Sequence, residues 1–266
     1  MVESSLTVNS IMKNKCVLPH IKPVIFILSI FSFLALWDLY AHLTDNNFLM
    51  PSVKETAVSL YEILISGSFL SFVSVAFSRV ITGLIYGIVI GIILAAICYK
   101  FDILKTAISP LISIMKATPV ACIIVLLWIR FNYTEIAILV VFLMVTPIVW
   151  QNVYDGLNSI DGNMLEVTYV FELTTWNKIR ALYLPTVLKY LLPAVITSIG
   201  MAWKAEIAAE IMTYSNIGEL IRDFKTVTFD TAAVFAWTII IIAFSMIFET
   251  GTKLLLRRLG NALNIE

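Results

Sequence analysis

The residues of this chain that could carry chemistry are charged side chains inside long apolar runs. Four of them have almost entirely hydrophobic neighbours: Arg79, Lys116, Lys204 and Glu206. A charge at the centre of a membrane-spanning helix costs at least a few kcal/mol, so such residues usually have a function or a charged partner. Glu206 and Glu210 are four residues apart and share a helix face, whereas Lys204 points elsewhere. We therefore consider two roles for these four residues: lining a path for a polar solute, or pairing between helices.

A second unusual feature is the polar segment 165–185, which lies between two apolar runs. It reads LEVTYVFELTTWNKIRALYLP. Charged and polar residues at this density do not lie in hydrocarbon, so the segment must form a structured loop at the membrane surface. Its length and patterning favour a loop that binds a partner, and an amphipathic surface helix without a partner is the alternative.

The same segment predicts two short helices joined by a turn. Residues 164–171 are predicted to form the first helix. Thr174 or Thr175 can cap a second helix, which begins near Trp176 and ends before Pro185, because a proline disfavours the helical conformation in the residue before it.

Signals for an enzyme are missing from the sequence. The two histidines, His20 and His42, have no ligand partners at useful spacing, and we predict no metal site. The three cysteines, Cys16, Cys98 and Cys122, are scattered, which favours free buried thiols over a disulfide. There is no G-x-x-x-x-G-K-[ST], G-x-S-x-G or H-E-x-x-H motif. Nothing here supports an enzyme acting on its own.

The composition points to an integral membrane protein. Of the 266 residues, 60% are hydrophobic and only 14% are charged, whereas a soluble protein carries about 25% charged residues. Basic and acidic residues balance at 18 each, so no net field attracts nucleic acid. Six apolar runs are long enough to span a bilayer, and their continuity favours helices over strands. They are residues 23–41, 72–99, 108–128, 134–150, 187–206 and 231–255.

The third run is the least regular of the six, because Lys116 and Pro119 interrupt it. If residues 108–128 form one helix, Lys116 lies about eight residues into it, which is roughly 12 Å at 1.5 Å per residue.

The distribution of basic residues predicts the orientation. With the N-terminus inside, the inner side holds eleven basic residues: Lys13, Lys15, Lys22, Lys100, Lys105, Lys178, Arg180, Lys189, Lys253, Arg257 and Arg258. The outer side holds four: Lys54, Arg130, Arg222 and Lys225. Both termini and the polar segment are therefore expected in the cytoplasm.

We expect one membrane domain with short flanking segments. Residues 1–22 are an inner segment, 23–69 are the first spanning helix and an outer loop, 70–256 are the core, and 257–266 are an inner tail. In the outer loop, Pro51 and Ser52 precede apolar residues at helical spacing, which predicts a short amphipathic helix. These are Val53, Ala57, Leu60 and Leu64. The second outer segment, 213–230, is read as short and polar.

The spacing within the polar segment resembles the loop of permeases of ABC-type importers. In that family the loop carries E-A-A, three residues, G, nine residues, I, one residue and L-P. This chain has Glu166 at the first position, Leu182 at the isoleucine position, and then Leu184-Pro185. The resemblance implies a loop that docks on a cytoplasmic ATPase. The implied docking residues are Glu166, Phe171, Glu172, Leu173, Leu182, Leu184 and Pro185.

The loop departs from the family pattern at three positions. Val167 and Thr168 replace the two alanines, and Glu172 stands where the glycine should be. That glycine would allow a turn with φ > 0, which a glutamate adopts only at some cost.

The resemblance covers roughly residues 70–256. It includes Ser78-Arg79-Val80, Ser109-Pro110-Leu111-Ile112 and Lys116-Ala117-Thr118-Pro119. The segments Ala202-Trp203-Lys204-Ala205-Glu206 and Ile217-Gly218-Glu219-Leu220-Ile221 are most similar to the nitrate/sulfonate/taurine branch. A departure falls at Ile129-Arg130-Phe131-Asn132, where many relatives carry Phe-Gly. Gly83, Gly87 and Gly91 form one smooth helix face, which favours close helix packing over a gating hinge.

The resemblance implies an all-α bundle of about six membrane helices with the fold of type I ABC importer permeases. Such a chain would work as a pair in a bacterial or archaeal plasma membrane. Its partners would be a cytoplasmic ATPase dimer that binds ATP and magnesium, a second permease copy and an extracytoplasmic binding protein, with lipid around it. The chain itself would hold no cofactor. The implied solute is a small anion such as a sulfonate, nitrate or taurine. An ion-gradient-driven secondary transporter and a non-transporting scaffold are the alternatives.

Overall fold

The computed structural model describes residues 21–44, 46 and 48–262, and this part of the chain is helical without a strand. The N-terminal segment 1–20, with Lys13 and Lys15, and the last residues, 263–266, lie outside the described residues. The long helices are α2 (Ile21–Thr44), α4 (Phe69–Lys100), α7 (Tyr133–Asn158), α10 (Leu184–Thr213) and α12 (Thr231–Ala262). Five helical segments are long and apolar enough to cross a membrane, with α10 extended at its start by the preceding turns.

The third apolar run is broken rather than continuous. It forms α5 (Asp102–Ala117) and α6 (Val120–Trp128), which meet at an angle of 101°. Thr118 takes an extended conformation with ψ 125° because it precedes Pro119. Its hydroxyl donates to the Ile114 carbonyl at 2.7 Å. The prediction of one helix over 108–128 was therefore wrong. Lys116 lies in the last turn of α5 and not in a helix interior, and the described spans number six only if this bent pair counts as one.

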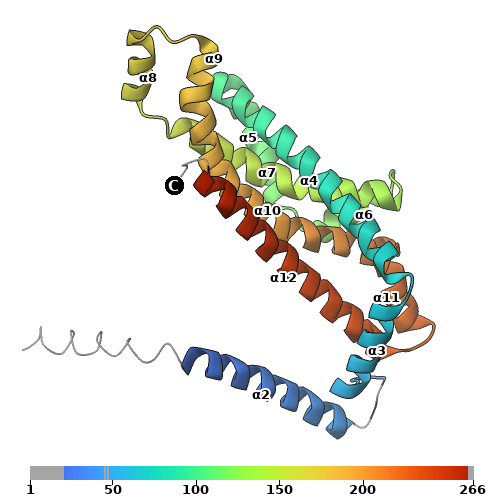
Figure 1. Cartoon of the computed structure of the whole chain (residues 1–266). Helices are drawn as coiled ribbons and strands as arrows, with labels where there is room; N and C mark the ends of the chain where they lie inside the picture. The colour runs from blue at the N-terminus through green and yellow to red at the C-terminus, as the bar shows by residue number, and fades with distance from the viewer. Residues whose placement is uncertain (1–20, 45, 47, 263–266) are drawn as a thin grey trace, which may run out of the picture.

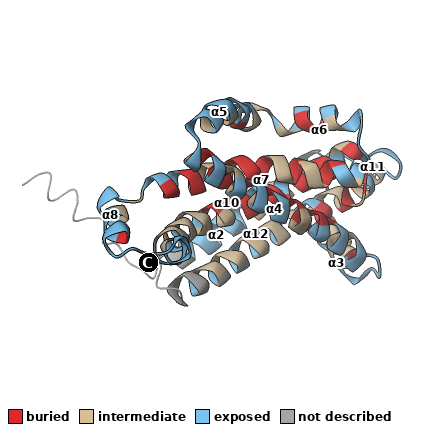
Figure 2. Cartoon of the chain, turned by 90° about the horizontal axis from the view of Figure 1, so that it is seen from above, coloured by how far each residue is buried: buried red, intermediate tan, exposed pale blue. Residues whose placement is uncertain are grey.

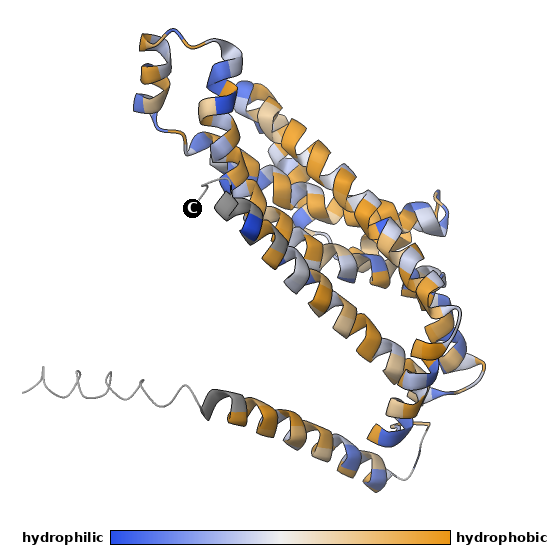
Figure 3. Cartoon of the chain, in the orientation of Figure 1, coloured by the Kyte–Doolittle hydropathy of each residue, from blue (hydrophilic) through white to orange (hydrophobic). Residues whose placement is uncertain are grey.

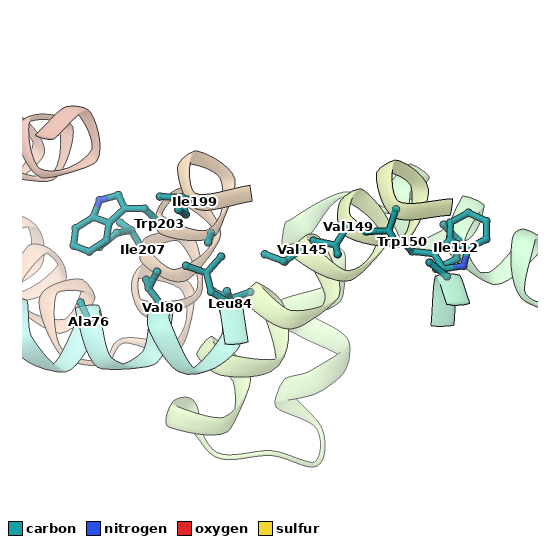
Figure 4. Packing of buried hydrophobic residues seen from close by; sticks show 14 of the residues in the cluster. Ala76, Val80, Leu84, Ile112, Val145, Val149, Trp150, Ile199, Trp203 and Ile207 are labelled. Carbon is teal, nitrogen blue, oxygen red and sulfur yellow. The ribbon is translucent and has the colours of Figure 1, made fainter. Parts of the chain in front are cut away.

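The core of the bundle is built on α7, whose contacts with α4 and with α10 are the most extensive among the described elements. Buried residues concentrate on α7, as Figure 2 shows. Side chains of α4 and α10 interdigitate around Trp203, while those of α7 reach toward Ile112 of α5 (Figure 4). This arrangement leaves α5 and α6 on one side of α7, and α12 beside α10.

Three glycines of α4 let its backbone approach α7 closely. Gly83, Gly87 and Gly91 face Val141, Val145 and Val149, respectively. A Cβ atom at Gly87 would lie 2.7 Å from the Cβ of Val145, which is too close for two carbons. The geometry supports the packing interpretation of this glycine face.

The first spanning helix, α2, lies away from the bundle (Figure 1). It touches the rest of the molecule near its C-terminal end, where Trp37 Nε1 donates to the Pro51 carbonyl at 3.0 Å and the Trp37 ring meets Phe235. The predicted amphipathic helix follows as α3 (Val53–Ile65), and Ser52 and Glu55 form a capping box at its start. The apolar side chains along most of α2 are exposed in the single chain.

The segment 213–230, which was predicted to lie outside the membrane, contains a helix that was not predicted. α11 (Ile217–Thr226) packs apolar side chains onto the core and is reached through two residues with positive φ, Tyr214 (52°) and Asn216 (50°). Gly218 is required at its start, because a Cβ there would lie 2.1 Å from the Glu210 carbonyl oxygen. Polar residues gather at this end and at the opposite end of the bundle, with apolar helices between them (Figure 3).

Candidate functional site

The polar segment forms two short helices that project from one end of the bundle (Figure 1). The first is α8 (Gly162–Val170), where the Asp161 side chain accepts from the Asn163 N–H at 3.0 Å. The second is α9 (Thr175–Lys178), capped by Thr174, whose hydroxyl oxygen accepts from the Asn177 N–H at 3.4 Å. Both helices begin close to their predicted positions.

Glu172 forms the turn between these helices in the left-handed conformation, with φ 49°. The Glu172 N–H donates to the Tyr169 carbonyl and the Leu173 N–H to the Thr168 carbonyl, each at 3.0 Å. This pair of bonds is a Schellman motif, which ends α8 and normally has glycine at the left-handed position. The backbone conformation that is expected of a glycine is thus present, although the residue is a glutamate.

The surface of the two helices carries exposed apolar side chains. Lys178 Nζ lies 3.9 Å from the centroid of the Tyr169 ring, a cation–π contact that joins α9 to α8. The exposed apolar residues are Met164, Val167, Tyr169, Val170, Phe171 and Trp176. We call the segment that carries this surface, with Glu166 and Glu172 beside it, the docking loop, after the role predicted for it. Patches of this kind mark interaction sites.

The second helix does not end before Pro185, which corrects the prediction. α9 passes through a π-helical segment, η1 (Ile179–Tyr183), directly into α10. The Leu184 N–H donates to the Ile179 carbonyl, five residues back, and this wider turn accommodates Pro185, which has no N–H of its own. The result is one helical segment of 39 residues, Thr175–Thr213.

The seven predicted docking residues therefore divide into two groups. Glu166, Phe171 and Glu172 are exposed on the projecting loop, and Leu173 lies half-buried in the turn. The other three, Leu182, Leu184 and Pro185, belong to the base of the long helix.

A second cluster of polar side chains lies near the opposite end of the bundle, inside the protein. Arg79 of α4 is 6% exposed, and its Nη1 donates to Glu210 Oε1 of α10 at 2.7 Å. Its Nη2 donates to the Thr134 hydroxyl of α7 at 3.3 Å, and the guanidinium lies 5.7 Å from the centroid of the Tyr133 ring. One arginine thus joins the three core helices.

Glu210 has further hydrogen-bond donors. The Asn216 side-chain amide donates to Glu210 Oε1 at 2.8 Å and also to the Phe72 carbonyl of α4 at 3.0 Å. The Ile217 N–H donates to Glu210 Oε2 at 3.2 Å. These bonds fasten the start of α11 to both α10 and α4. Helical spacing predicted that Glu210 shares a face with Glu206, whereas no role was predicted for Asn216 or Thr134.

Glu206 lies one turn before Glu210 and is fully buried. Its Oε1 is 4.0 Å from Arg79 Nη1, and neither of its carboxylate oxygens has a hydrogen-bond partner among the described residues. The structure therefore brings Arg79 and Glu206 together, as one of the two predicted roles requires.

The other two predicted charges lie elsewhere. Lys116 Nζ donates to Gln151 Oε1 at 3.3 Å, and the amide of Gln151 in turn donates to Asp155. Lys204 is exposed on α10, away from the buried face of Glu206, and within the described part of the chain it forms no ion pair. Neither lysine joins the buried cluster.

Comparisons with known proteins agree with this architecture. Residues 87–261 match the family of binding-protein-dependent transport system inner membrane components. The chain is 23% identical over 229 residues to SsuC of Bacillus subtilis, a permease named for aliphatic sulfonate transport, with 85% of this chain and 83% of the relative covered. It is 24% identical over 184 residues to ThiX of Halalkalibacterium halodurans, a permease named for formylaminopyrimidine transport, with 68% and 70% covered.

Two solved structures have the same fold. An amino acid ABC transporter superposes with a TM-score of 0.58 at 16% identity, over 73% of this chain and 97% of that one. The methionine transporter MetNI superposes with a TM-score of 0.61 at 13% identity, over 73% and 99%. The bundle is thus that of a type I ABC importer permease, and the chain belongs to the family of binding-protein-dependent inner membrane transport components, as the non-catalytic, multi-pass permease subunit of an ABC importer.

Proposed function

We propose that the docking loop couples this permease to a cytoplasmic ATPase that binds ATP and magnesium. The observation that carries the proposal is the exposed apolar surface of α8 and α9, with Phe171 72% and Trp176 69% exposed. Aromatic side chains in such numbers are typical of the centres of protein interfaces. The loop lies on the side that the distribution of basic residues assigns to the cytoplasm.

The covalent path from this loop to the core supports a coupling role. Because α9, η1 and α10 form one continuous helical segment, Trp176 and Glu210 belong to the same rigid helical unit, which we call the rod. A displacement of the loop by the ATPase would move the rod within the bundle. The π-helical segment is the place where this rod departs from regular geometry, and such segments often mark functional sites.

Transport further requires a second permease copy and a binding protein on the outer side. We propose that the end of the bundle with α3 and α11 meets the binding protein. A cavity of about 540 Å³ lies at this end, between α3 with the loop before it and the start of α12 with the loop that follows α11. Its residues are Phe48, Pro51, Ser52, Lys54, Glu55, Val58, Ser59, Phe229, Asp230, Thr231 and Ala232.

The solute we favour is a small anion of the sulfonate class. Two observations support this: the resemblance to a permease named for aliphatic sulfonates, and the exposed lysines Lys116 and Lys204, which have no carboxylate within ion-pair distance among the described residues. The resemblance to a permease named for formylaminopyrimidine makes a pyrimidine the competing solute. Uptake competition between an alkanesulfonate and the pyrimidine in cells that depend on this transporter separates the two.

Co-purification tests the docking role. The permease is expressed with its ATPase, and the double variant Phe171→Asp/Trp176→Asp is compared with Val227→Asp, which changes an equally exposed apolar residue at the opposite end (68% exposed). We expect the double variant to insert in the membrane and lose the ATPase, while Val227→Asp retains it. Equal ATPase recovery with both variants would refute the docking role.

A further inference from the structure

The buried cluster around Arg79 contains a donor and two acceptors that lack partners. Arg79 Nε and both carboxylate oxygens of Glu206 are buried, and none has a hydrogen-bond partner among the described residues. Buried polar atoms are nearly always paired, so three unpaired atoms in one ion cluster require an explanation. A second arrangement of the same side chains, in which the Arg79 guanidinium is hydrogen-bonded to Glu206, would supply it.

The geometry places that second arrangement within easy reach. Arg79 Nη1 is 2.7 Å from Glu210 Oε1 and 4.0 Å from Glu206 Oε1. The two glutamates lie one turn apart on the same face of α10. A small shift of α10 along α4, or a rotation of the guanidinium, would bring Arg79 into hydrogen-bond contact with Glu206.

The two carboxylates differ in the hydrogen bonds that remain to them when Arg79 moves. Glu210 retains the Asn216 amide at 2.8 Å and the Ile217 N–H at 3.2 Å, so it stays hydrogen-bonded without the arginine. Glu206 has only the Glu210 carboxyl and the Arg79 guanidinium as charged neighbours among the described residues. Moving the guanidinium toward Glu206 therefore pairs an unpaired acceptor without leaving a new one.

The element that carries both carboxylates is the one that reaches the docking loop. α10 continues through η1 and α9 into that loop, and Arg79 stands on the neighbouring α4. A displacement of the loop would therefore shift Glu206 and Glu210 past Arg79. Packed cores respond to such shifts by changing between discrete arrangements rather than by deforming continuously.

We propose that Glu206 is a positioning residue of the transport cycle: it is the second acceptor for Arg79, whose guanidinium moves from Glu210 to Glu206 when the ATPase displaces the docking loop. The inference rests on the proposed coupling role of that loop. In the arrangement described here Glu206 has no hydrogen bond to Arg79. In the arrangement reached after the ATPase displaces the loop, it has one.

The test compares Glu206→Gln, Glu206→Asp and the control Glu219→Gln, which changes an exposed glutamate of α11, in the complete transporter with its binding protein. Because the Arg79–Glu210 bond is untouched, Glu206→Gln should assemble with the ATPase and unfold at the wild-type temperature. We expect its ATP-driven uptake to fall about tenfold or more, with partial recovery in Glu206→Asp and no change in Glu219→Gln.

Uptake by Glu206→Gln at the wild-type rate would overturn the proposal, since Glu206 would then serve only in packing. If Glu206→Gln does not assemble, a structure of the wild-type transporter trapped with nucleotide decides. In it, Arg79 Nη1 should lie closer to Glu206 than to Glu210, and the opposite order would overturn the proposal. Absence of ATP-driven uptake by the wild-type transporter would instead refute the proposed function, and the inference with it.

Discussion

At the scale of single residues, the docking loop depends on one strained position. Glu172 adopts φ 49° to end α8, although residues with a Cβ atom pay a cost of about 1–2 kcal/mol in this conformation. Its side chain is exposed, so within the described chain nothing in the loop compensates through burial. The departure from glycine at this position is therefore expected to lower local stability without changing the shape of the turn.

Replacing Glu172 by glycine should remove that cost. We expect Glu172→Gly to raise the stability of the loop by about 1 kcal/mol, and Glu172→Ala, which keeps a Cβ atom, to leave it nearly unchanged. Hydrogen exchange of the α8 amides in the purified complex measures the difference. A Glu172→Gly loop that exchanges no more slowly than Glu172→Ala would show that the left-handed turn is not strained.

Arg79 should be the most sensitive of the intramembrane charges. Arg79→Gln leaves Glu210 and Glu206 buried without a cation, and removing one partner of a buried ion pair costs about 3–5 kcal/mol. The matched control is Arg222→Gln, whose half-exposed pair with Asp223 contributes at most about 1 kcal/mol. The yield of folded permease and its unfolding temperature should drop for Arg79→Gln and stay unchanged for Arg222→Gln. Equal behaviour of the two variants would contradict the assigned geometry.

The sequence predicted part of this cluster and could not predict the rest. Helical spacing placed Glu206 and Glu210 on one face, because that relation is local. The bond from Arg79 to Glu210 joins residues 131 positions apart, and the contribution of Asn216 depends on a backbone turn with positive φ. Such contacts follow from tertiary packing and have no signature at short range.

At the scale of helices, close packing of α4 on α7 holds the core together. The three glycines of α4 are spaced by four residues and face valines at the same spacing, so each helix presents one uninterrupted face to the other. The regular spacing made this face predictable from the sequence.

Gly87→Ala should therefore destabilise the core. The added Cβ would lie 2.7 Å from Val145, and overpacking of this kind costs about 1–3 kcal/mol. The control is Gly251→Ala in α12, where no atom lies within 4 Å of the added Cβ and the substitution should be neutral or stabilising. Unfolding temperatures in detergent measure both. A Gly87→Ala permease as stable as Gly251→Ala would mean that α4 and α7 do not pack as described.

Two of the predicted helix ends were wrong at prolines. Pro119 breaks its run, whereas Pro185 is accommodated by the π-helical segment before it, although both residues lack an N–H. The difference lies in the backbone around each proline, which local sequence does not specify. α11 is a different case, because its sequence carries a local signal: Ile217, Leu220, Ile221 and Phe224 have the i, i+3, i+4, i+7 spacing of an amphipathic helix.

At the scale of the whole molecule, the chain has two chemically distinct ends. The docking loop and the C-terminal end of α12 lie at one end, and α3 and α11 lie at the other (Figure 1). The exposed apolar surface of α2 is suited to lipid or to a second copy of the chain. Membership of the family makes both ATPase and binding-protein contacts part of the same assembly.

The predicted orientation has a direct test in intact cells. With the three cysteines replaced by serine or alanine, single cysteines are placed at the exposed positions Ser66, beside α3, and Thr175, in the docking loop. A membrane-impermeant maleimide should label Ser66→Cys in intact spheroplasts and Thr175→Cys only after lysis. The reverse pattern would invert the assignment of inner and outer ends.

ATP hydrolysis shows whether the docking loop transmits the action of the ATPase to the membrane helices. The purified ATPase is added to the permease in lipid nanodiscs, and hydrolysis is measured with and without the liganded binding protein. We predict severalfold stimulation with the wild-type permease and none with Phe171→Asp/Trp176→Asp. Undiminished stimulation with the double variant would contradict the account.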